Sequence, residues 1–488
     1  MSSTLILTCV VVYSALLFFV VWLTSRNADN ESYFIGNRSS NWYVVAYGMI
    51  GASLSGVTFL SVPGAVATTQ FSYMQVVMGY LVGYSVIALV LMPVYYKLNL
   101  TSIYSYLEQR FGFWSYKTGS FFFIVSRVIG ASFRVFIVVN VLQTFVFDQM
   151  GIPFYVTVGV FILLILLYTY KGGVKTIVWT DMLQTTFMLL SVILSVVIIS
   201  NQLGLNFSDL FSQVRDSDYS KIFVQDVQSP NYFWKNFWGG TFIAIAMTGL
   251  DQEMMQKNLS CKNIKEAKKN MFTFTFVLFF VNLLFLVLGA VLCFYAAQKN
   301  IVIDPKHTDD LFPGIAFHYL GTIPGLLFII GLISAAYPSA DGALTALTTV
   351  FCYDFLGIQK NKELDELKRK RIRHVVHISF AVILLLTVVL FRIINDDAVI
   401  RNLFKVASYT YGPLLGLYAF GFFMKVNVRD KLVPFICLLS PVICWIINDY
   451  APVWFNGYKF GFELLIVNGM ITFVGLFFLR IKNVAIVH

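Results

Sequence analysis

The chain contains 488 residues, of which 58% are hydrophobic and only 12% are charged, and its mean hydropathy is +0.75. Because a soluble globular chain carries about 25% charged residues, this composition excludes a soluble enzyme or binding domain. The six cysteines show neither a disulfide framework nor the spacing of metal ligands. Since the sequence also contains no nucleophile elbow, phosphate-binding loop or zinc motif, we expect a membrane protein that is not an enzyme.

Apolar stretches long enough to cross a bilayer recur along the whole chain. A spanning helix needs about 20 mostly apolar residues, and no connection between the apolar stretches is long enough to form a separate domain. The sequence therefore predicts an all-α polytopic membrane protein with about thirteen transmembrane helices. The predicted spans are residues 4–25, 42–67, 72–98, 114–147, 153–170, 176–202, 235–258, 270–298, 322–355, 374–395, 400–425, 431–449 and 460–481.

The placement of lysine and arginine predicts the orientation in the membrane. The first span does not resemble a signal peptide, because the preceding MSST carries no positive side chain. Arg26 follows this span directly, so the N-terminus is expected outside and the C-terminus in the cytoplasm. The basic runs 257–269 and 368–373 are interpreted as loop anchors at an anionic leaflet and not as nucleic-acid sites. A bacterial-type inner membrane is the predicted location.

The predicted span at 42–67 is interrupted at its centre by the polar sequence GASLSGVTF, from Gly51 to Phe59. Within lipid, a non-helical backbone is tolerated only where protein or a water-filled cavity satisfies its amides and carbonyls. Broken helices of this kind place free carbonyls around an ion or solute near the bilayer midplane. A closely packed continuous helix is the alternative, since glycine and serine also mark tight helix contacts.

Ionisable residues within the predicted spans are few, and such residues are functional candidates because they are costly in a membrane. Asp251, Glu253 and Asp354 lie near the predicted cytoplasmic interface, where we expect them to cap helices or to pair with basic loops. Asp181 follows a pair of glycines near the start of a span. It either caps that helix, pairs with Lys175, or serves as a buried carboxylate for a cation.

The span at 322–355 contains the polar sequence SAAYPSADGALTALTT. Pro338 removes one intrahelical hydrogen bond and thereby frees a carbonyl. Hard cations such as sodium prefer oxygen ligands, and this helix supplies several in Ser339, Asp341, Thr345, Thr348 and Thr349. The hydroxyls alternatively bond to their own backbone. Together with the interrupted span, this helix predicts a cation site.

The spans are also compatible with an internal repeat. Residues 42–202 and 235–425 divide into two five-helix halves of opposite orientation, and glycine interrupts corresponding spans of both. Such segments point to a binding site between the halves. Residues 1–41 then form the first helix and a cytoplasmic lead-in, 203–234 an extracytoplasmic loop, and 426–488 two C-terminal helices.

Six motifs in this order resemble the sodium/solute symporter family, which includes bacterial galactose, proline and sialic acid symporters. They are SYFIGNRSSNWY (32–43), GASLSGVTFLSVPG (51–64), TSIYSYLEQRFG (101–112), GGVKTIVWTDMLQ (172–184), GLDQEMMQKNL (249–259) and SAAYPSADGAL (334–344). The resemblance covers nearly the whole chain. It implies thirteen helices, an inverted five-plus-five core of the LeuT type, and alternating access.

The resemblance also implies sodium ligands. At the main site these correspond to Gly51 and Leu54 in the broken helix and to Ala335 and Ser339 in the ion-binding helix. A second sodium site, present in some members, uses an acid that matches Asp181.

The sequence departs from the family pattern in the same region. The family typically has serine at the position of Pro338 and often has serine at the position of Gly342. One hydroxyl ligand is therefore missing at the main sodium site and one at the second sodium site. Asp341 is a further candidate sodium ligand, and a proton on Asp181 or Asp341 is the alternative.

In this family the solute lies beside the broken helix. The corresponding candidates here are Ser53, Ser55, Thr58, Tyr73 and Gln75. The position of Arg134 resembles that of an arginine that holds a carboxylate in the sialic acid symporter. A guanidinium in a low-dielectric pocket suits bidentate binding of a carboxylate; a structural pair or a side chain reaching to the interface is the alternative.

The sequence therefore predicts a sodium-coupled symporter that imports a small organic solute, such as an acidic sugar like sialic acid or another carboxylate. Its expected partners are the solute, sodium (or a proton) and the lipid bilayer, without nucleic acid; no oligomeric state is predicted. A solute sensor on the same fold would bind without accumulating solute. A passive or proton-coupled carrier is the third possibility.

Overall fold

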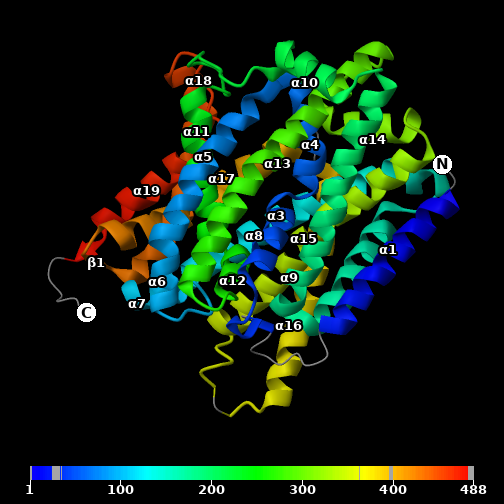
Figure 1. The fold of residues 1–488 in the computed structure, drawn as a ribbon. Coiled ribbons are helices and arrows are strands. Elements are labelled where there is room, and N and C mark those ends of the chain that lie inside the picture. Colours follow the sequence, from blue (N-terminus) through cyan, green and yellow to red (C-terminus); the bar gives the residue numbers. More distant parts are fainter. Residues whose placement is uncertain (1–2, 25–32, 35, 362, 395–398, 482–488) are drawn as a thin grey trace.

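The computed structural model describes residues 3–24, 33–34, 36–361, 363–394 and 399–481, and most of them are helical (Figure 1). Two-residue strands β1 (Asn427–Val428) and β2 (Arg480–Ile481) form one antiparallel pair. The α-helices are α1 (Ser3–Thr24), α3 (Trp42–Ser53), α4 (Gly56–Thr69), α5 (Tyr73–Val86), α6 (Met92–Lys97), α7 (Ser105–Arg110), α8 (Phe113–Leu142), α9 (Phe154–Gln202), α10 (Phe207–Asp216), α11 (Phe233–Ala244), α12 (Gln252–Leu259), α13 (Ile264–Gln298), α14 (Leu311–His318), α15 (Thr322–Val350), α16 (Glu366–Ile394), α17 (Val399–Phe423), α18 (Val433–Trp454) and α19 (Leu464–Phe478).

Length and composition confirm a multi-pass membrane protein. Within the described ranges, 8 helical stretches are long and apolar enough to cross a bilayer, and two shorter apolar helices lie at Phe154–Tyr170 and Leu464–Phe478. Helices overlap each of the thirteen predicted spans, but several of these are broken, so the count of thirteen stays a prediction. The orientation also stays a prediction, and Arg26 lies outside the described residues.

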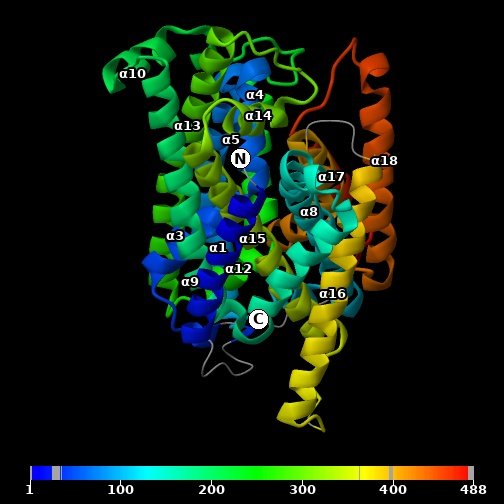
Figure 2. The same cartoon turned by 90° about the vertical axis from the view of Figure 1, so that its right-hand side faces the viewer.

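Helix α15 forms the centre of the bundle. Every residue from Gly331 to Val350 is buried, because α15 packs against α9, α8, α16 and α3. Helix α1 lies on the outside against α9, while α18 and α19 pack on α17 at the opposite side (Figures 1 and 2). A polar residue on α15 is therefore surrounded by protein.

The first core helix is broken where the sequence predicts it. Helix α3 ends at Ser53, and α4 starts at Gly56 after the non-helical residues Leu54 (φ −86°, ψ 79°) and Ser55 (φ −75°, ψ 178°). A Cβ atom on Gly56 would lie 2.2 Å from Cγ2 of Val138, so α8 approaches this break too closely for a side chain. The alternative of a continuous packed helix is wrong.

Two further interruptions shape the core. Gly173 has φ 52° and divides α9 into two helices, at the glycine pair between the predicted spans 153–170 and 176–202. The predicted span 235–258 is divided at Asp251, whose side chain accepts hydrogen bonds from the amides of Glu253 and Met254 and so caps α12. The expected capping role of Asp251 is confirmed.

Candidate functional site

A cavity opens beside the break between α3 and α4. Its walls come from the break, α5, α8, α11, the π-helical turn Ile245–Gly249, α12, α13 and α17, and the space free of protein atoms, including its opening to solvent, is about 700 Å³. The structure places five of the six predicted solute-binding residues on this one cavity, namely Ser53, Ser55, Thr58, Tyr73 and Arg134. Only about 70 Å³ of this space admits a water-sized molecule, so the cavity is narrow in this structure.

The sixth predicted residue, Gln75, does not line the cavity. Its Nε2 donates to the carbonyls of Ser72 at 3.1 Å and Asn231 at 3.0 Å, and its Oε1 accepts from the amide of Val224 at 3.4 Å. The amide group of Gln75 therefore fastens the connection before α11 to the start of α5. Gln75 as a solute ligand therefore stays a prediction, which its position outside this cavity does not support.

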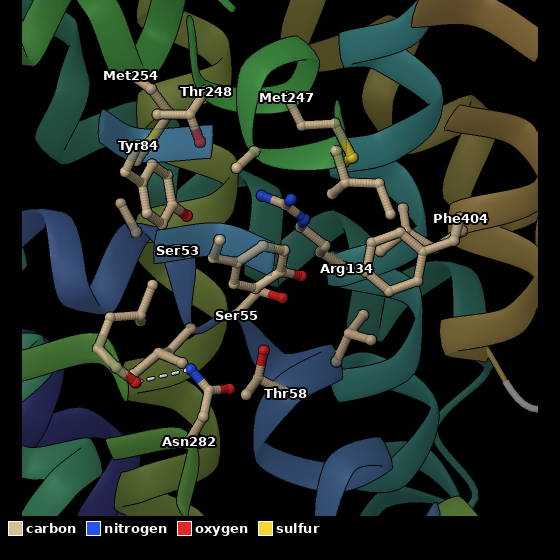
Figure 3. A pocket seen from close by; sticks show the side chains of 18 of the residues that line it. Ser53, Ser55, Thr58, Tyr84, Arg134, Met247, Thr248, Met254, Asn282 and Phe404 are labelled. Carbon is tan, nitrogen blue, oxygen red and sulfur yellow. Dashed lines mark hydrogen bonds between the residues drawn. The ribbon is translucent and has the colours of Figure 1, made fainter. Parts of the chain in front are cut away.

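The cavity also contains polar residues that the sequence analysis missed. Tyr80, Tyr84, Thr248 and Asn282 line it, and the hydroxyls of Tyr73 and Tyr80 lie 3.3 Å apart. Met247 and Phe404 add apolar surface (Figure 3). All four polar residues lie within predicted spans. A polar side chain inside a membrane helix is the signal that could have identified them.

Arg134 is the charged group on this cavity that has no acidic partner within the described part of the chain. Its side chain is half-buried, and its buried Nε has no hydrogen-bond partner there. Figure 3 shows the guanidinium reaching from α8 toward Tyr84 and Thr248. The neighbouring Arg127, in contrast, pairs with Glu253 and lies 3.6 Å from the carboxylate of Asp251. Arg134 thus forms no ion pair with any acidic residue that the structure describes.

The four main sodium-site candidates lie on two elements that pack directly against each other, α15 and the break in the first core helix. Among the described residues, no backbone amide donates to the carbonyl oxygens of Gly51 or Leu54. Ala335 and Ser339 are fully buried, and the Ser339 hydroxyl has no hydrogen-bond partner there. Buried oxygens without donors are what a bound cation requires, and Gly51, Leu54 and Ser339 supply such oxygens, so the site fits sodium.

Asp181 is buried and paired with a lysine other than the one expected. Its Oδ2 lies 2.7 Å from Nζ of Lys257, whereas Lys175 forms no ion pair among the described residues. Lys257 is only 3% exposed and also contacts Oε1 of Glu253 at 3.3 Å. The interpretation of Lys257 as part of a loop anchor is wrong, because the basic run starts inside α12. The expectation that Glu253 pairs with a basic residue is confirmed.

Asp341 lies near this ion pair on α15. Its Oδ2 accepts a hydrogen bond of 2.7 Å from the hydroxyl of Tyr168, and its Oδ1 has no hydrogen-bond partner among the residues described. Asp181 and Lys257 are close enough to interact with it electrostatically. The two acidic sodium candidates, Asp181 and Asp341, therefore lie in the same region between α9, α12 and α15. Lys257 lies in that region too.

Asp354 has a different role from the one expected. Its carboxylate accepts hydrogen bonds of 2.7 Å from each of Ser102, Tyr116 and Ser120, while Lys117 contacts its backbone carbonyl. It pairs with no basic side chain in the described ranges, and it joins α8 to the end of α15 through hydroxyls. It takes no part in the cavity.

Comparisons with known proteins agree with this architecture. A solved structure of a Na+-coupled sialic acid symporter, in a substrate-bound outward-open state, matches with a TM-score of 0.83 at 19% identity and covers 96% of both chains. A transporter of the nucleobase-cation-symport-1 family matches with a TM-score of 0.57 at 11% identity, over 92% of this chain and 93% of that one. The chain therefore has the LeuT-type fold.

Sequence relatives are transporters and not enzymes. The sodium/sialic acid symporter of Proteus mirabilis (strain HI4320) is 23% identical over 476 residues, or 94% of this chain and 92% of the relative. The sodium-coupled monocarboxylate transporter 2 of Bos taurus is 26% identical over 419 residues, or 83% of this chain and 66% of the relative. The model of the sodium:solute symporter family matches residues 33–430. The chain belongs to the sodium:solute symporter family.

Proposed function

We propose that this sodium-coupled symporter imports a small organic carboxylate, and that Arg134 binds the carboxylate group. The observation that carries the proposal is a half-buried guanidinium that forms no ion pair among the described residues, in a polar cavity beside the broken helix. An unpaired buried charge is costly, and a bidentate carboxylate is the ligand that matches the planar fork of arginine. The solute would supply the missing counter-ion.

The hydroxyl and amide groups of the cavity favour a solute that carries hydroxyls of its own. Ser55 and Thr58 lie on the broken helix, and Tyr84 and Asn282 face them from α5 and α13. The names of the relatives specify anions, namely sialic acid, monocarboxylates and iodide. An acidic sugar such as sialic acid uses both the guanidinium and these hydroxyls, whereas a short monocarboxylate uses mainly the guanidinium.

Sodium would bind between the break and α15. The carbonyls of Gly51, Leu54 and Ala335 and the hydroxyl of Ser339 are the proposed ligands. Pro338 has no amide hydrogen, so the carbonyl of Ser334, one turn earlier, lacks its usual intrahelical donor. This carbonyl lies next to Ala335 in the chain and offsets the hydroxyl that is absent at position 338.

The proposed mechanism follows from the position of these ligands. Sodium would join α15 to the broken helix, whose other face lines the solute cavity, so binding of the ion orders the solute site. Coupling requires that sodium bind one conformation more tightly than the other. The proposed orientation has the N-terminus outside and the C-terminus in the cytoplasm, and solute enters from outside.

Uptake into proteoliposomes tests this function. N-acetylneuraminate, lactate, galactose and proline would each be offered with an inward sodium gradient, an inward proton gradient, or no gradient. We expect accumulation of carboxylates without an amino group, driven by sodium alone. Equal uptake of galactose, or accumulation that needs only protons, would overturn the proposal. Binding without accumulation under any gradient would favour a solute sensor.

A matched pair of variants isolates the carboxylate contact. Arg134→Gln should abolish the preference for carboxylates, because the guanidinium is lost. Arg215→Gln, at an exposed surface pair with Asp216, should leave uptake unchanged.

A further inference from the structure

A cluster of buried charges lies between α9, α12 and α15, separate from the solute cavity. Asp181 belongs to α9, Glu253 and Lys257 to α12, and Asp341 to α15, and none of these side chains is more than 3% exposed. Two of the three carboxyl groups, those of Asp181 and Glu253, contact the ammonium group of Lys257. Glu253 also pairs with Arg127, whereas Asp181 pairs with Lys257.

The ammonium group of Lys257 is held at a position that suits a cation bound by oxygen. It lies 2.7 Å from Oδ2 of Asp181 and 3.3 Å from Oε1 of Glu253. The second oxygens of Asp181 and Asp341 have no hydrogen-bond partner in the part of the chain that the structure describes. A free metal ion would bind to the same group of carboxylates, but the ammonium already lies against Asp181 and Glu253 and would repel it.

The backbone of α15 is fitted to this arrangement. A Cβ atom on Gly342 would lie 2.3 Å from Oε1 of Glu253 and 2.5 Å from its Cδ. The carboxylate of Glu253 therefore occupies the space that a side chain at position 342 would need. The same oxygen contacts Lys257. The glycine at position 342 therefore leaves room for a carboxylate that holds the ammonium group in place.

We propose that the ammonium group of Lys257 takes the place of a second sodium ion between α9, α12 and α15, so that sodium binds this protein only at the break beside α15. The inference rests on the proposed sodium symport. In this proposal, Lys257 limits the number of sodium ions that accompany each solute, and Asp181 is not a sodium ligand.

Equilibrium binding of radioactive sodium to the purified full-length protein tests the inference without any solute. The wild type should bind one sodium ion per chain at saturation. Lys257→Ala removes the tethered cation and leaves room beside Asp181 and Asp341, so this variant should bind one ion more than the wild type. Lys257→Arg keeps the positive charge and should bind the same number as the wild type.

Two controls separate this effect from general damage. Lys235 is also buried, at the start of α11, where it contacts the carbonyl of Ser229 and the ring of Tyr458. Lys235→Ala should leave the number of bound ions unchanged. Asp181→Asn should likewise retain the wild-type number, and this variant tests the inference even if Lys257→Ala does not fold.

The outcomes are distinguishable. Two ions bound to the wild type, an unchanged number in folded Lys257→Ala, or the loss of one ion in Asp181→Asn would each overturn the role of Lys257. No sodium bound to the wild type would refute the proposed main site instead. In that case, one ion bound to Lys257→Ala would still support the tethered cation.

Discussion

The hydroxyl of Ser339 offers a test of the sodium site, because its removal should affect ion binding and stability in opposite directions. The side chain is 0% exposed, and its oxygen has no hydrogen-bond partner among the described residues. Ser339→Ala deletes this oxygen and changes little else. If sodium uses the oxygen, the variant loses a ligand but no hydrogen bond within the protein.

The expected changes in stability and in sodium affinity follow from comparing the site without sodium and with sodium. Without sodium, burial of an unsatisfied hydroxyl costs about 1–3 kcal/mol, so its deletion should leave stability unchanged or raise it by up to that amount. With sodium, loss of a polar contact to a charge costs about 1.5–3 kcal/mol. Since about 1.4 kcal/mol corresponds to a factor of ten, the dissociation constant for sodium should rise about 10- to 150-fold.

Thermal unfolding in detergent provides the assay. The protein would be heated at increasing sodium concentration, with choline replacing sodium to hold ionic strength constant. At a concentration about 100 times its dissociation constant, an ion that binds only the folded state stabilises it by about 2.7 kcal/mol. For a variant with 100-fold weaker binding, the same concentration contributes only about 0.4 kcal/mol.

A neighbouring hydroxyl on the same helix is the matched control. The Thr349 hydroxyl accepts a hydrogen bond of 2.9 Å from Gln256 and donates one of 2.8 Å to the carbonyl of Thr345. Thr349→Val should lower the melting temperature with and without sodium and leave the sodium-induced increase intact. The reasoning is refuted if Ser339→Ala behaves like Thr349→Val.

Three other substitutions test the cavity and its frame. Arg134→Lys keeps the charge but loses the bidentate fork, so KM for the transported carboxylate should rise about 10-fold or more, which initial-rate uptake would show; an unchanged KM would contradict the role of Arg134. Gly56→Ala places a Cβ atom 2.2 Å from Val138 and should destabilise the protein by about 1–3 kcal/mol. The control Gly159→Ala, whose Cβ atom would have nothing within 4 Å, should stabilise it by about 0.5–1 kcal/mol. The melting temperatures of the two variants test this difference. Gln75→Ala should lower the melting temperature without raising KM, because the side chain lies outside the cavity.

Local sequence patterns predicted the parts of the fold that depend on local chemistry. The polar interruption in an apolar span correctly located the break at Leu54 and Ser55, because a spanning helix needs apolar side chains and a regular backbone. The glycine pair before Lys175 correctly located the division of α9 at Gly173. The resemblance to a family placed Arg134 and the serines of the break on one cavity.

Contacts between distant segments could not be predicted in the same way. Lys257 stands at the head of a basic run, which resembles a solvated loop, and only the packing of α12 against α15 buries it. The pairing of Arg127 with Glu253 joins residues that no periodicity relates. Gln75 is polar within a span, but polarity alone does not distinguish an amide that fastens a loop from one that binds solute.

The contact between Gly342 and Glu253 has an evolutionary consequence. Since the carboxylate fills the space of a side chain at position 342, a side chain there would have to displace it. A larger residue at 342 requires a shorter one at 253, and the lysine then loses one of its two acidic neighbours. Across related chains, these three positions should therefore vary together, and the ratio of ions to solute should change where they change.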